Sequence, residues 1–395
     1  MIRKTRLFTP GPTPLLPAAQ QAMAFYDMHH RTADFRALLT RTLADLKEFV
    51  GTKNDVLILA SSGTGAMEAS VSNLTSPGDK VLVLTAGKFG ERWRDLARAY
   101  NCNVELVTAP YGQTFSLEEV RAKLHGAKAV YMQATETSTG ARHDVKAIAQ
   151  LVREQGDDAL LVVDAITGLG TTHFDVDGWG VDVLIGGSQK ALMIPPGLSY
   201  CSVSERAWQR MESAKSPRFY FDLRKERKAA AKGESAYTPA TTLIAGMAAA
   251  LEHVRQMGKG DMAAGRMALV DSAELCAAMT RAAVQALSLK LFAPSCPSAA
   301  VTAVVAPAGV DSSAIVKDFR ETFAAVVANG QGEMKGQLFR VAHLGYYDYL
   351  DTVAFAAALE QVLARVGSQK INFGSAVRAA QEVYALAENP QPVSA

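Results

Sequence analysis

The sequence has few cysteines, few histidines and no long uninterrupted apolar run. Its 4 cysteines and 7 histidines include no Cys-x-x-Cys pair and no metal-ligand spacing, so we expect neither a disulfide framework nor a bound metal. No apolar stretch approaches the roughly 18 residues of a membrane-spanning helix. Pro10, Pro12 and Pro14 follow the basic N-terminus before any apolar run typical of a signal peptide. We therefore expect a cytoplasmic protein that does not enter a membrane.

An excess of charge of one sign is also missing. The 41 Lys and Arg residues nearly balance the 39 Asp and Glu residues, which leaves a formal charge of +2. This balance gives no electrostatic footprint for nucleic acid or an anionic membrane, and we expect neither as a partner. A content of 49% hydrophobic and 20% charged residues is typical of a soluble globular protein. The 395 residues suffice for two or three domains of roughly 150 residues each.

The sequence does contain a regular alternation of short apolar runs and segments of helical period, between residues 56 and 203. Near-continuous Val, Leu and Ile runs are typical of strands in a parallel sheet that helices cover on both faces. We therefore predict an α/β fold with a large, doubly wound, mostly parallel seven-stranded sheet. The runs are residues 56–60, 81–85, 104–107, 129–133, 160–163, 183–185 and 198–203.

The pattern changes after residue 215. Residues 215–235 carry seven Lys or Arg against three acidic residues, which is typical of a solvated surface segment. A long helix is predicted over 261–288, and a smaller α/β unit follows it, with strands at 300–305 and 338–342. We predict three parts: an N-terminal arm (1–20), a large domain (21–260) and a smaller C-terminal α/β domain (261–395).

Ligands of wound sheets bind at the carboxyl ends of the strands, so the residues that follow the strands are candidates for chemistry. After residue 60, the segment Ser61-Ser62-Gly63-Thr64-Gly65 leads into a predicted helix. Backbone amides at a helix N-terminus, hydroxyls of Ser62 and Thr64, and glycines that permit close approach would form a phosphate cradle. An ordinary helix cap with a tight turn is the alternative interpretation.

Two ionisable residues follow two other strands. Asp164 comes directly after 160–163, and Lys190 lies just beyond 183–185 in a Gly-Gly-Ser-Gln-Lys segment. Such a carboxylate either caps a turn or faces a charged ligand, because its ionisation is costly there. Such a lysine has a lowered pKa and is a candidate for Schiff-base formation. A phosphate cradle, an acid and a lysine are together what pyridoxal phosphate requires for its phosphate, ring nitrogen and aldehyde.

With these groups the sequence resembles the class V branch of the fold-type I aminotransferases, especially the alanine-glyoxylate, serine-glyoxylate and serine-pyruvate aminotransferases. The resemblance implies a fold-type I transferase that depends on pyridoxal 5'-phosphate. Its motifs run in the family's order across nearly the whole chain. They are Pro10-Gly11-Pro12, Ser62-Gly63-Thr64-Gly65-Ala66-Met67-Glu68, Glu136-Thr137-Ser138-Thr139-Gly140, Val163-Asp164-Ala165, Gly187-Ser188-Gln189-Lys190-Ala191, Pro195-Pro196-Gly197 and Phe339-Arg340-Val341-Ala342-His343-Leu344-Gly345.

The resemblance also implies a role for each matching residue. Lys190 would bind the cofactor aldehyde as a Schiff base and act as the catalytic base, and Asp164 would pair with the pyridinium nitrogen. Phe89 falls where relatives place an aromatic side chain, often Trp, against the cofactor ring; an ordinary core aromatic is the alternative. The other implied cofactor contacts are Ser62, Gly63, Thr64 and Gln189 at the phosphate, and the hydroxyl of Thr137 near the ring.

Four further positions concern the substrate and the assembly. Arg340 lies on a predicted strand, where its guanidinium can hold the α-carboxylate of a substrate through two parallel hydrogen bonds. An inter-strand ion pair is the alternative. Pro10 and Gly11 are expected at the substrate entrance or in a purely structural arm. Thr238 matches a residue that reaches the phosphate of the neighbouring subunit. This match implies a homodimer with shared sites and makes the basic segment an interface candidate.

Transamination is the activity that the resemblance implies, with an amino group passing from alanine or serine to glyoxylate or pyruvate in a ping-pong cycle. The lack of a second arginine in a recognised motif favours these small substrates over dicarboxylates. Cysteine desulfurase chemistry is disfavoured, because Gln189 stands where those enzymes usually have His before the lysine. The alternatives are a lyase or decarboxylase on the same scaffold, and a non-catalytic partner like the related chains labelled soluble hydrogenase subunits.

Overall fold

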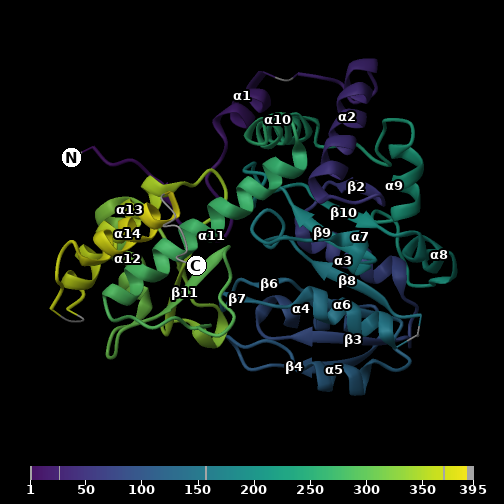
Figure 1. The fold of residues 1–395 in the computed structure, drawn as a ribbon. Coiled ribbons are helices and arrows are strands. Elements are labelled where there is room, and N and C mark those ends of the chain that lie inside the picture. The colour runs from purple at the N-terminus through teal and green to yellow at the C-terminus, as the bar shows by residue number, and fades with distance from the viewer. Residues whose placement is uncertain (1, 26, 156–157, 368–369, 389–395) are drawn as a thin grey trace, which may run out of the picture.

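The computed structural model describes residues 2–25, 27–155, 158–367 and 370–388. A large unit is built on a seven-stranded sheet, and a smaller unit surrounds a three-stranded sheet. The long helix α11 (Met262–Ala286) runs from the large unit into the small one (Figure 1).

The large sheet has the strand order β2-β10-β9-β8-β5-β3-β4. Only β10 runs antiparallel to its two neighbours, β2 and β9, and the other pairs are parallel. The seven apolar runs of the sequence form these seven strands, which confirms the predicted mostly parallel α/β sheet. The strands are β2 (Asp55–Leu59), β3 (Lys80–Thr85), β4 (Asn103–Thr108), β5 (Ala129–Gln133), β8 (Leu160–Asp164), β9 (Val183–Gly187) and β10 (Ser199–Val203).

Helices cover both faces of this sheet, as a doubly wound fold requires. In β8, Leu161 and Val163 enter the core on one face, whereas Leu160 and Val162 enter the core on the other. Helices α2 (Ala33–Val50), α5 (Leu117–Leu124), α6 (Val145–Glu154), α7 (Val176–Trp179) and α10 (Thr241–Met257) contribute to the first core. The second core includes residues of α3 (Gly63–Leu74), α4 (Lys88–Ala99), α8 (Glu205–Ser213) and α9 (Leu223–Ala230).

Helix α3 illustrates how local sequence forms these elements. Met67, Val71 and Leu74 are four and three residues apart, which places them on one helical face, and all three are fully buried. Helix α6 begins where it does because the Asp144 side chain accepts a hydrogen bond from the backbone nitrogen of Ala147 at 2.9 Å.

The smaller unit contains an antiparallel sheet with β14 at its centre, between β11 and β13. The strands expected at 300–305 and 338–342 are β11 and β14, while β13 and the last helix were not predicted. The bounds are β11 (Val301–Val305), β13 (Ala328–Asn329), β14 (Leu338–Ala342), α12 (Ser312–Phe323), α13 (Tyr349–Arg365), α14 (Ser375–Glu388) and a 3₁₀ turn at Gly332–Met334.

The N-terminal segment contacts both units. Strand β1 (Arg6–Leu7) pairs in parallel with β12 (Ala325–Val326) of the smaller unit, whereas α1 (Pro17–Phe25) packs on α10 of the large unit. The proline-rich segment between them therefore bridges the units. The division into an arm, a large domain and a small domain at residues 20 and 260 stays our proposal.

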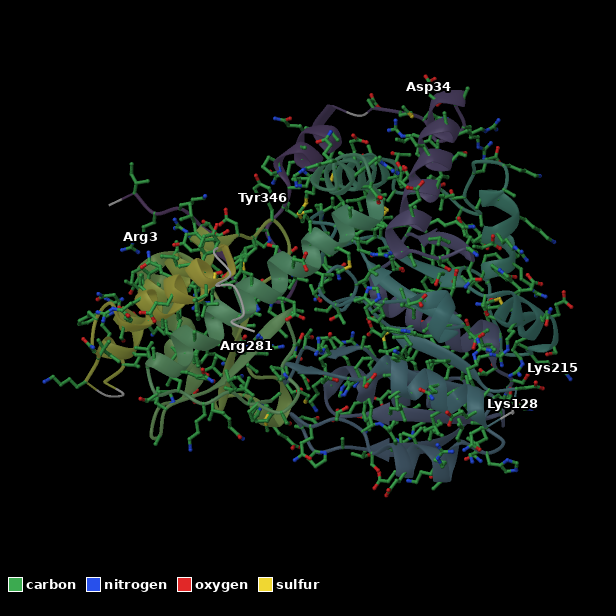
Figure 2. All side chains as sticks on the ribbon, viewed as in Figure 1. Arg3, Asp34, Lys128, Lys215, Arg281 and Tyr346 are labelled. Atoms are coloured by element: carbon green, nitrogen blue, oxygen red, sulfur yellow. The ribbon has the colours of Figure 1, made fainter. Side chains whose placement is uncertain are left out.

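The basic segment begins at the surface of the large unit. Lys215 is exposed and lies on the side away from the smaller unit (Figure 2). Within the four described ranges, no helix combines the length and the apolar character needed to cross a membrane. The same ranges hold no group of three or more His, Cys, Asp or Glu side chains that could bind a metal ion.

Candidate functional site

The predicted site residues gather at the carboxyl edge of the large sheet. Asp164 is the last residue of β8, and Lys190 lies in the turn that follows β9, the adjacent parallel strand. The segment between β2 and α3 carries Ser62. Because parallel strands end at the same edge, the fold brings these three positions to one edge of the sheet.

Lys190 and Asp164 form the electrostatic centre of this site. Burial lowers the pKa of Lys190 to about 8, although the negative charge of Asp164 opposes this shift. Burial raises the pKa of Asp164 to about 6, opposed by a hydrogen bond from the backbone nitrogen of Ile166 and by the charges of Lys190 and Arg92. An amine with this pKa is partly neutral near neutral pH and can act as a nucleophile or a base.

The proline-rich segment lies directly against Lys190. The Nζ atom of Lys190 donates a hydrogen bond to the carbonyl oxygen of Pro10. Gly11 has φ +146°, and a Cβ atom there would lie 2.5 Å from that Nζ atom, so a side chain at this position would displace the lysine. The hydroxyl of Thr13 donates to the carbonyl oxygens of Gln189 and Lys190. This segment thus forms one wall around the lysine.

The start of α3 has the features of an anion site. Ser62 is the exposed N-cap residue, and its side chain makes no capping hydrogen bond. A Cβ atom on Gly63 would clash with the end of the Ile166 side chain, so a larger residue there would require Ile166 to move. The Oε1 atom of Gln189 is buried without a hydrogen-bond partner in the described chain. A free hydroxyl and the first amides of a helix fit a phosphate group, to which Gln189 can donate only through its Nε2 amide.

Glu136 holds the start of α4, where Phe89 lies. Its Oε2 atom accepts hydrogen bonds from the backbone nitrogens of Phe89 and Gly90 at 3.1 and 3.2 Å. Its Oε1 atom accepts from the backbone nitrogen and the hydroxyl of Ser138. Burial raises the pKa of Glu136, and these hydrogen bonds oppose the shift. Glu136, in strand β6 (Thr135–Glu136) of a hairpin with β7 (Ala141–Arg142), therefore ties the hairpin to α4.

Arg340 projects from β14 and is only 4% exposed. Its Nη1 atom donates to the carbonyl oxygen of Thr137 at 2.9 Å, and its Nε and Nη2 atoms donate to that of Asn329 at 3.0 and 2.7 Å. Within the described residues these carbonyls, and no carboxylate, are its partners, so the inter-strand ion pair is not formed. Burial lowers the pKa of Arg340 to about 10, opposed by the charge of Glu136. One N–H on each of Nη1 and Nη2 stays available for a ligand.

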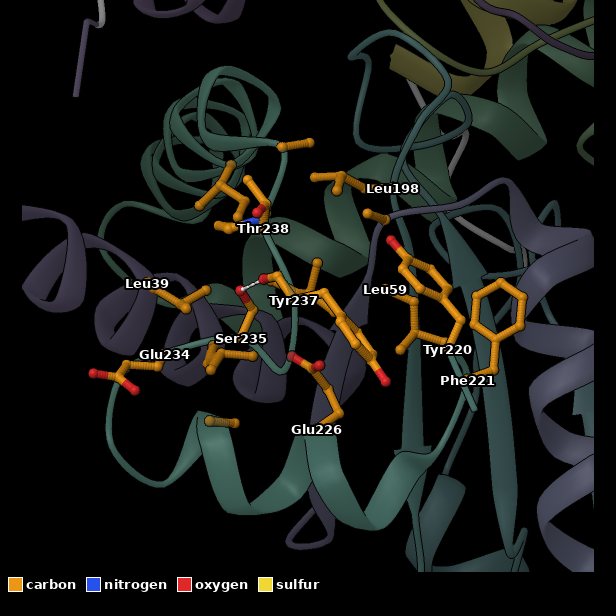
Figure 3. Close-up of a pocket in the computed structure, with 17 residues that line it drawn as sticks. Leu39, Leu59, Leu198, Tyr220, Phe221, Glu226, Glu234, Ser235, Tyr237 and Thr238 are labelled. Atoms are coloured by element: carbon orange, nitrogen blue, oxygen red, sulfur yellow. Dashed lines mark hydrogen bonds between the residues drawn. The ribbon is translucent and has the colours of Figure 1, made fainter. Parts of the chain in front are cut away.

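Thr238 lines a different hollow. This cavity of about 40 Å³ lies near the end of β2, and neither Lys190 nor Asp164 lines it. Tyr220, Phe221 and Tyr237 form its aromatic side, and the Ser235 hydroxyl donates to the carbonyl oxygen of Tyr237 at 2.6 Å (Figure 3). The proposed reach of Thr238 across to a second subunit stays a prediction.

Sequence reasoning missed two residues of this site. Arg92 on α4 donates from Nη1 to the hydroxyl of Thr64 at 3.0 Å, and its Cζ atom lies 4.8 Å from the centre of the Phe89 ring. Glu136 entered the sequence argument only as part of a motif. The available signals were weak: Arg92 follows Phe89 by three residues in a helical pattern, and Glu136 closely follows a buried strand.

Comparisons with known proteins give the chain its context. Residues 7–331 match the family described as Aminotransferase class-V. The chain is 41% identical to the "Soluble hydrogenase, small subunit" of a Synechococcus species, over 97% of this chain and 99% of that protein. It is 34% identical to the L-aspartate–glyoxylate aminotransferase of Paracoccus denitrificans, over 97% of each. The solved structure of an alanine–glyoxylate aminotransferase from Nostoc superposes with a TM-score of 0.85 and 31% identity, over 92% of this chain and 96% of that one.

Proposed function

The chain belongs to the class-V aminotransferase family of pyridoxal-phosphate-dependent enzymes, and from this premise we propose that it transfers an amino group from alanine or serine to glyoxylate or pyruvate. One observation carries the proposal: Lys190 and Asp164 lie at the carboxyl ends of adjacent strands, where burial displaces the pKa of each toward neutrality. Buried titratable groups with displaced pKa values that lie together at a ligand-binding edge are typical of catalytic sites.

The residues present fit the cofactor. The start of α3, with Ser62, Gly63 and Thr64, would hold its phosphate together with Gln189, and Phe89 would face its ring. Asp164 would pair with the ring nitrogen, which is a cation that this buried carboxylate needs in order to ionise. Pyridoxal phosphate supplies an electron sink for the pair of electrons released at the substrate α-carbon.

Lys190 is the group that moves protons in this proposal. Its Nζ atom would hold the cofactor before the substrate arrives, and then remove the proton from the α-carbon as a neutral base. The carbonyl oxygen of Pro10, which accepts a hydrogen bond from this Nζ atom, would help to orient the free amine. The same lysine would return the proton, and the second oxo acid would reverse these steps in a ping-pong cycle.

Arg340 would bind the α-carboxylate of both substrates. Its guanidinium is already held by Thr137 and Asn329, so little side-chain entropy is lost when a carboxylate binds to the two remaining N–H groups. Glyoxylate is an acceptor in the names of the Paracoccus and Nostoc proteins, which supports a small oxo acid here.

We further propose a homodimer in which Thr238 reaches the phosphate of the partner subunit. Tyr220 lines the cavity that contains Thr238, and Phe219 is the residue before it in the chain; their side chains are 47% and 72% exposed. Exposed aromatic side chains of this size commonly mark an interface. Sedimentation velocity should give twice the mass of the chain. The cytoplasmic location stays a prediction.

A half-reaction screen tests the proposed activity. The loaded enzyme is mixed with one amino acid at a time, and loss of the bound cofactor's visible absorbance is followed together with the 2-oxo acid released. Alanine or serine should react, and aspartate should react much more slowly. The Lys190→Ala variant should release no 2-oxo acid with any of them.

Other outcomes separate the alternatives. Carbon dioxide or ammonia release without an oxo acid acceptor would identify a decarboxylase or lyase. A holoprotein that reacts with no amino acid would favour the partner-subunit interpretation. Preference for aspartate would retain transamination and overturn the proposed small substrates.

A further inference from the structure

Arg92 is a cation of the site that the proposed function does not yet use. It lies in the first half of α4 and contacts two residues from different elements, the hydroxyl of Thr64 in α3 and the ring of Phe89. Arg94 on the same helix pairs with Asp95 at 2.8 Å, whereas Arg92 has no carboxylate partner in the part of the chain that the structure describes. An arginine without a counter-ion, held between two expected cofactor contacts, is available to an anion.

The phosphate of the cofactor lacks a positive partner among the residues assigned so far. A phosphate monoester carries between about −1.5 and −2 charges at pH 7. Ser62, Gly63, Thr64 and Gln189 offer only neutral donors, and a buried anion needs hydrogen bonds and an opposite charge. The two N–H groups that Arg340 has left are assigned to the substrate carboxylate in the proposed function. Arg92 is therefore the cation within reach of the start of α3.

The geometry points to Arg92 as the residue that neutralises the cofactor phosphate. Its planar guanidinium rests over the Phe89 ring, and its Nη1 atom is aimed at the first turn of α3 by the bond to Thr64. Guanidinium groups bind phosphate through two parallel hydrogen bonds. The inference rests on the proposed function, because it assumes that pyridoxal phosphate occupies this site.

Binding of Arg92 to the phosphate would also restrict which substrates fit the site. A guanidinium engaged by phosphate is not free to bind a second carboxylate. The charge of Arg92 acts on the pKa values of both Asp164 and Lys190, so a free Arg92 guanidinium would compete with Arg340 for such a group. Its engagement by phosphate would leave Arg340 alone to bind substrate carboxylates, in agreement with small monocarboxylic substrates.

Equilibrium binding of two forms of the cofactor tests the inference without measuring turnover. The apoprotein is titrated with pyridoxal phosphate and with pyridoxal, which lacks the phosphate, and protein fluorescence or cofactor absorbance reports the dissociation constants. Arg92→Gln should weaken pyridoxal phosphate binding by about 10- to 150-fold, the range of a charge-assisted hydrogen bond, and change pyridoxal binding less than twofold.

Matched variants keep the test decisive. Arg98→Gln makes the same charge change at an exposed position of α4 and should alter neither constant. Arg92→Lys keeps the charge without the planar fork, and should cause a smaller loss confined to pyridoxal phosphate. Circular dichroism will show whether Arg92→Gln folds. If it does not, the Arg92→Lys variant tests the inference in its place.

Two outcomes would overturn the inference and leave the proposed function standing. Equal weakening of both ligands would assign Arg92 to the ring site or to folding. Unchanged pyridoxal phosphate affinity with a raised KM for the amino acid would assign it to a substrate carboxylate. Wild-type protein that binds neither ligand would instead refute the proposed function on which the inference rests.

Discussion

The guanidinium of Arg340 donates from its Nη1 atom to the backbone carbonyl oxygen of Thr137 at 2.9 Å, although the two residues are 203 positions apart. This bond links β14 of the smaller unit to the turn after β6 in the large one. The same turn begins with Glu136, which accepts hydrogen bonds from the start of α4 beside Phe89. One short turn therefore positions Arg340, which we expect to bind the substrate carboxylate, relative to Phe89, which we expect to face the cofactor ring.

Arg340→Lys should weaken amino acid binding. A lysine cannot reproduce the fork that satisfies Thr137, Asn329 and a carboxylate together. A loss of about 1.5 to 3 kcal/mol, typical of one hydrogen bond to a charged group, raises KM by about 10- to 150-fold. The measurement is KM in the half-reaction, with pyridoxal phosphate affinity as the control. An unchanged KM would show that Arg340 only connects the two units.

Glu136→Gln should destabilise the fold. The carboxamide would present an N–H group toward donors that the carboxylate now accepts from, and a buried unsatisfied donor costs about 1 to 3 kcal/mol. Denaturant unfolding should show this loss, and Ser138→Ala, which removes one donor and keeps the acceptor, should lose less. Equal losses in the two variants would mean that Glu136 contributes no more than its bond to Ser138.

Asp164→Asn should leave the cofactor bound and slow turnover. The neutral amide cannot stabilise a protonated ring nitrogen, and losses of about 10² to 10⁴ in rate are typical when a proton-transfer environment is disturbed. Single-turnover kinetics with alanine provides the measurement, and cofactor content by absorbance is the control. A rate within twofold of wild type would remove Asp164 from the mechanism.

Covalent capture of pyridoxal phosphate by the apoprotein should depend on pH with a midpoint near 8. The pKa of Lys190 is lowered to about 8 by burial, so the reactive neutral amine is scarce below that pH and predominates above it. Capture is fixed with borohydride at timed intervals and quantified at Lys190 by mass spectrometry. An ordinary lysine would instead gain reactivity up to about pH 10.4.

Two variants sharpen this pH test. Asp164→Asn removes the negative charge that raises the pKa of Lys190, so its midpoint should move to lower pH. Lys190→Ala should show no capture at that position. A wild-type midpoint above pH 10 would contradict the buried environment of the lysine.

Much of the fold follows from local sequence. The seven apolar runs form the seven strands of the large sheet. Each run is short, contains mainly apolar side chains and lies between segments with helical spacing of apolar residues. The same strand pattern led to Asp164 and Lys190, because a charged residue at the end of a buried run is conspicuous. The helix predicted over 261–288 is α11, and it was predictable because its helical spacing of apolar residues continues over about seven turns.

Other features depend on contacts that no local pattern encodes. The antiparallel pairing of β10 with β2, and the pairing of β1 with β12, join segments more than a hundred residues apart. The same holds for the bond from Arg340 to Thr137. Arg92 and Glu136 look like ordinary charged residues in the sequence. Periodicity records which side of an element is buried, but the identity of the neighbour on that side is settled by long-range packing, so these partners emerge only in the folded chain.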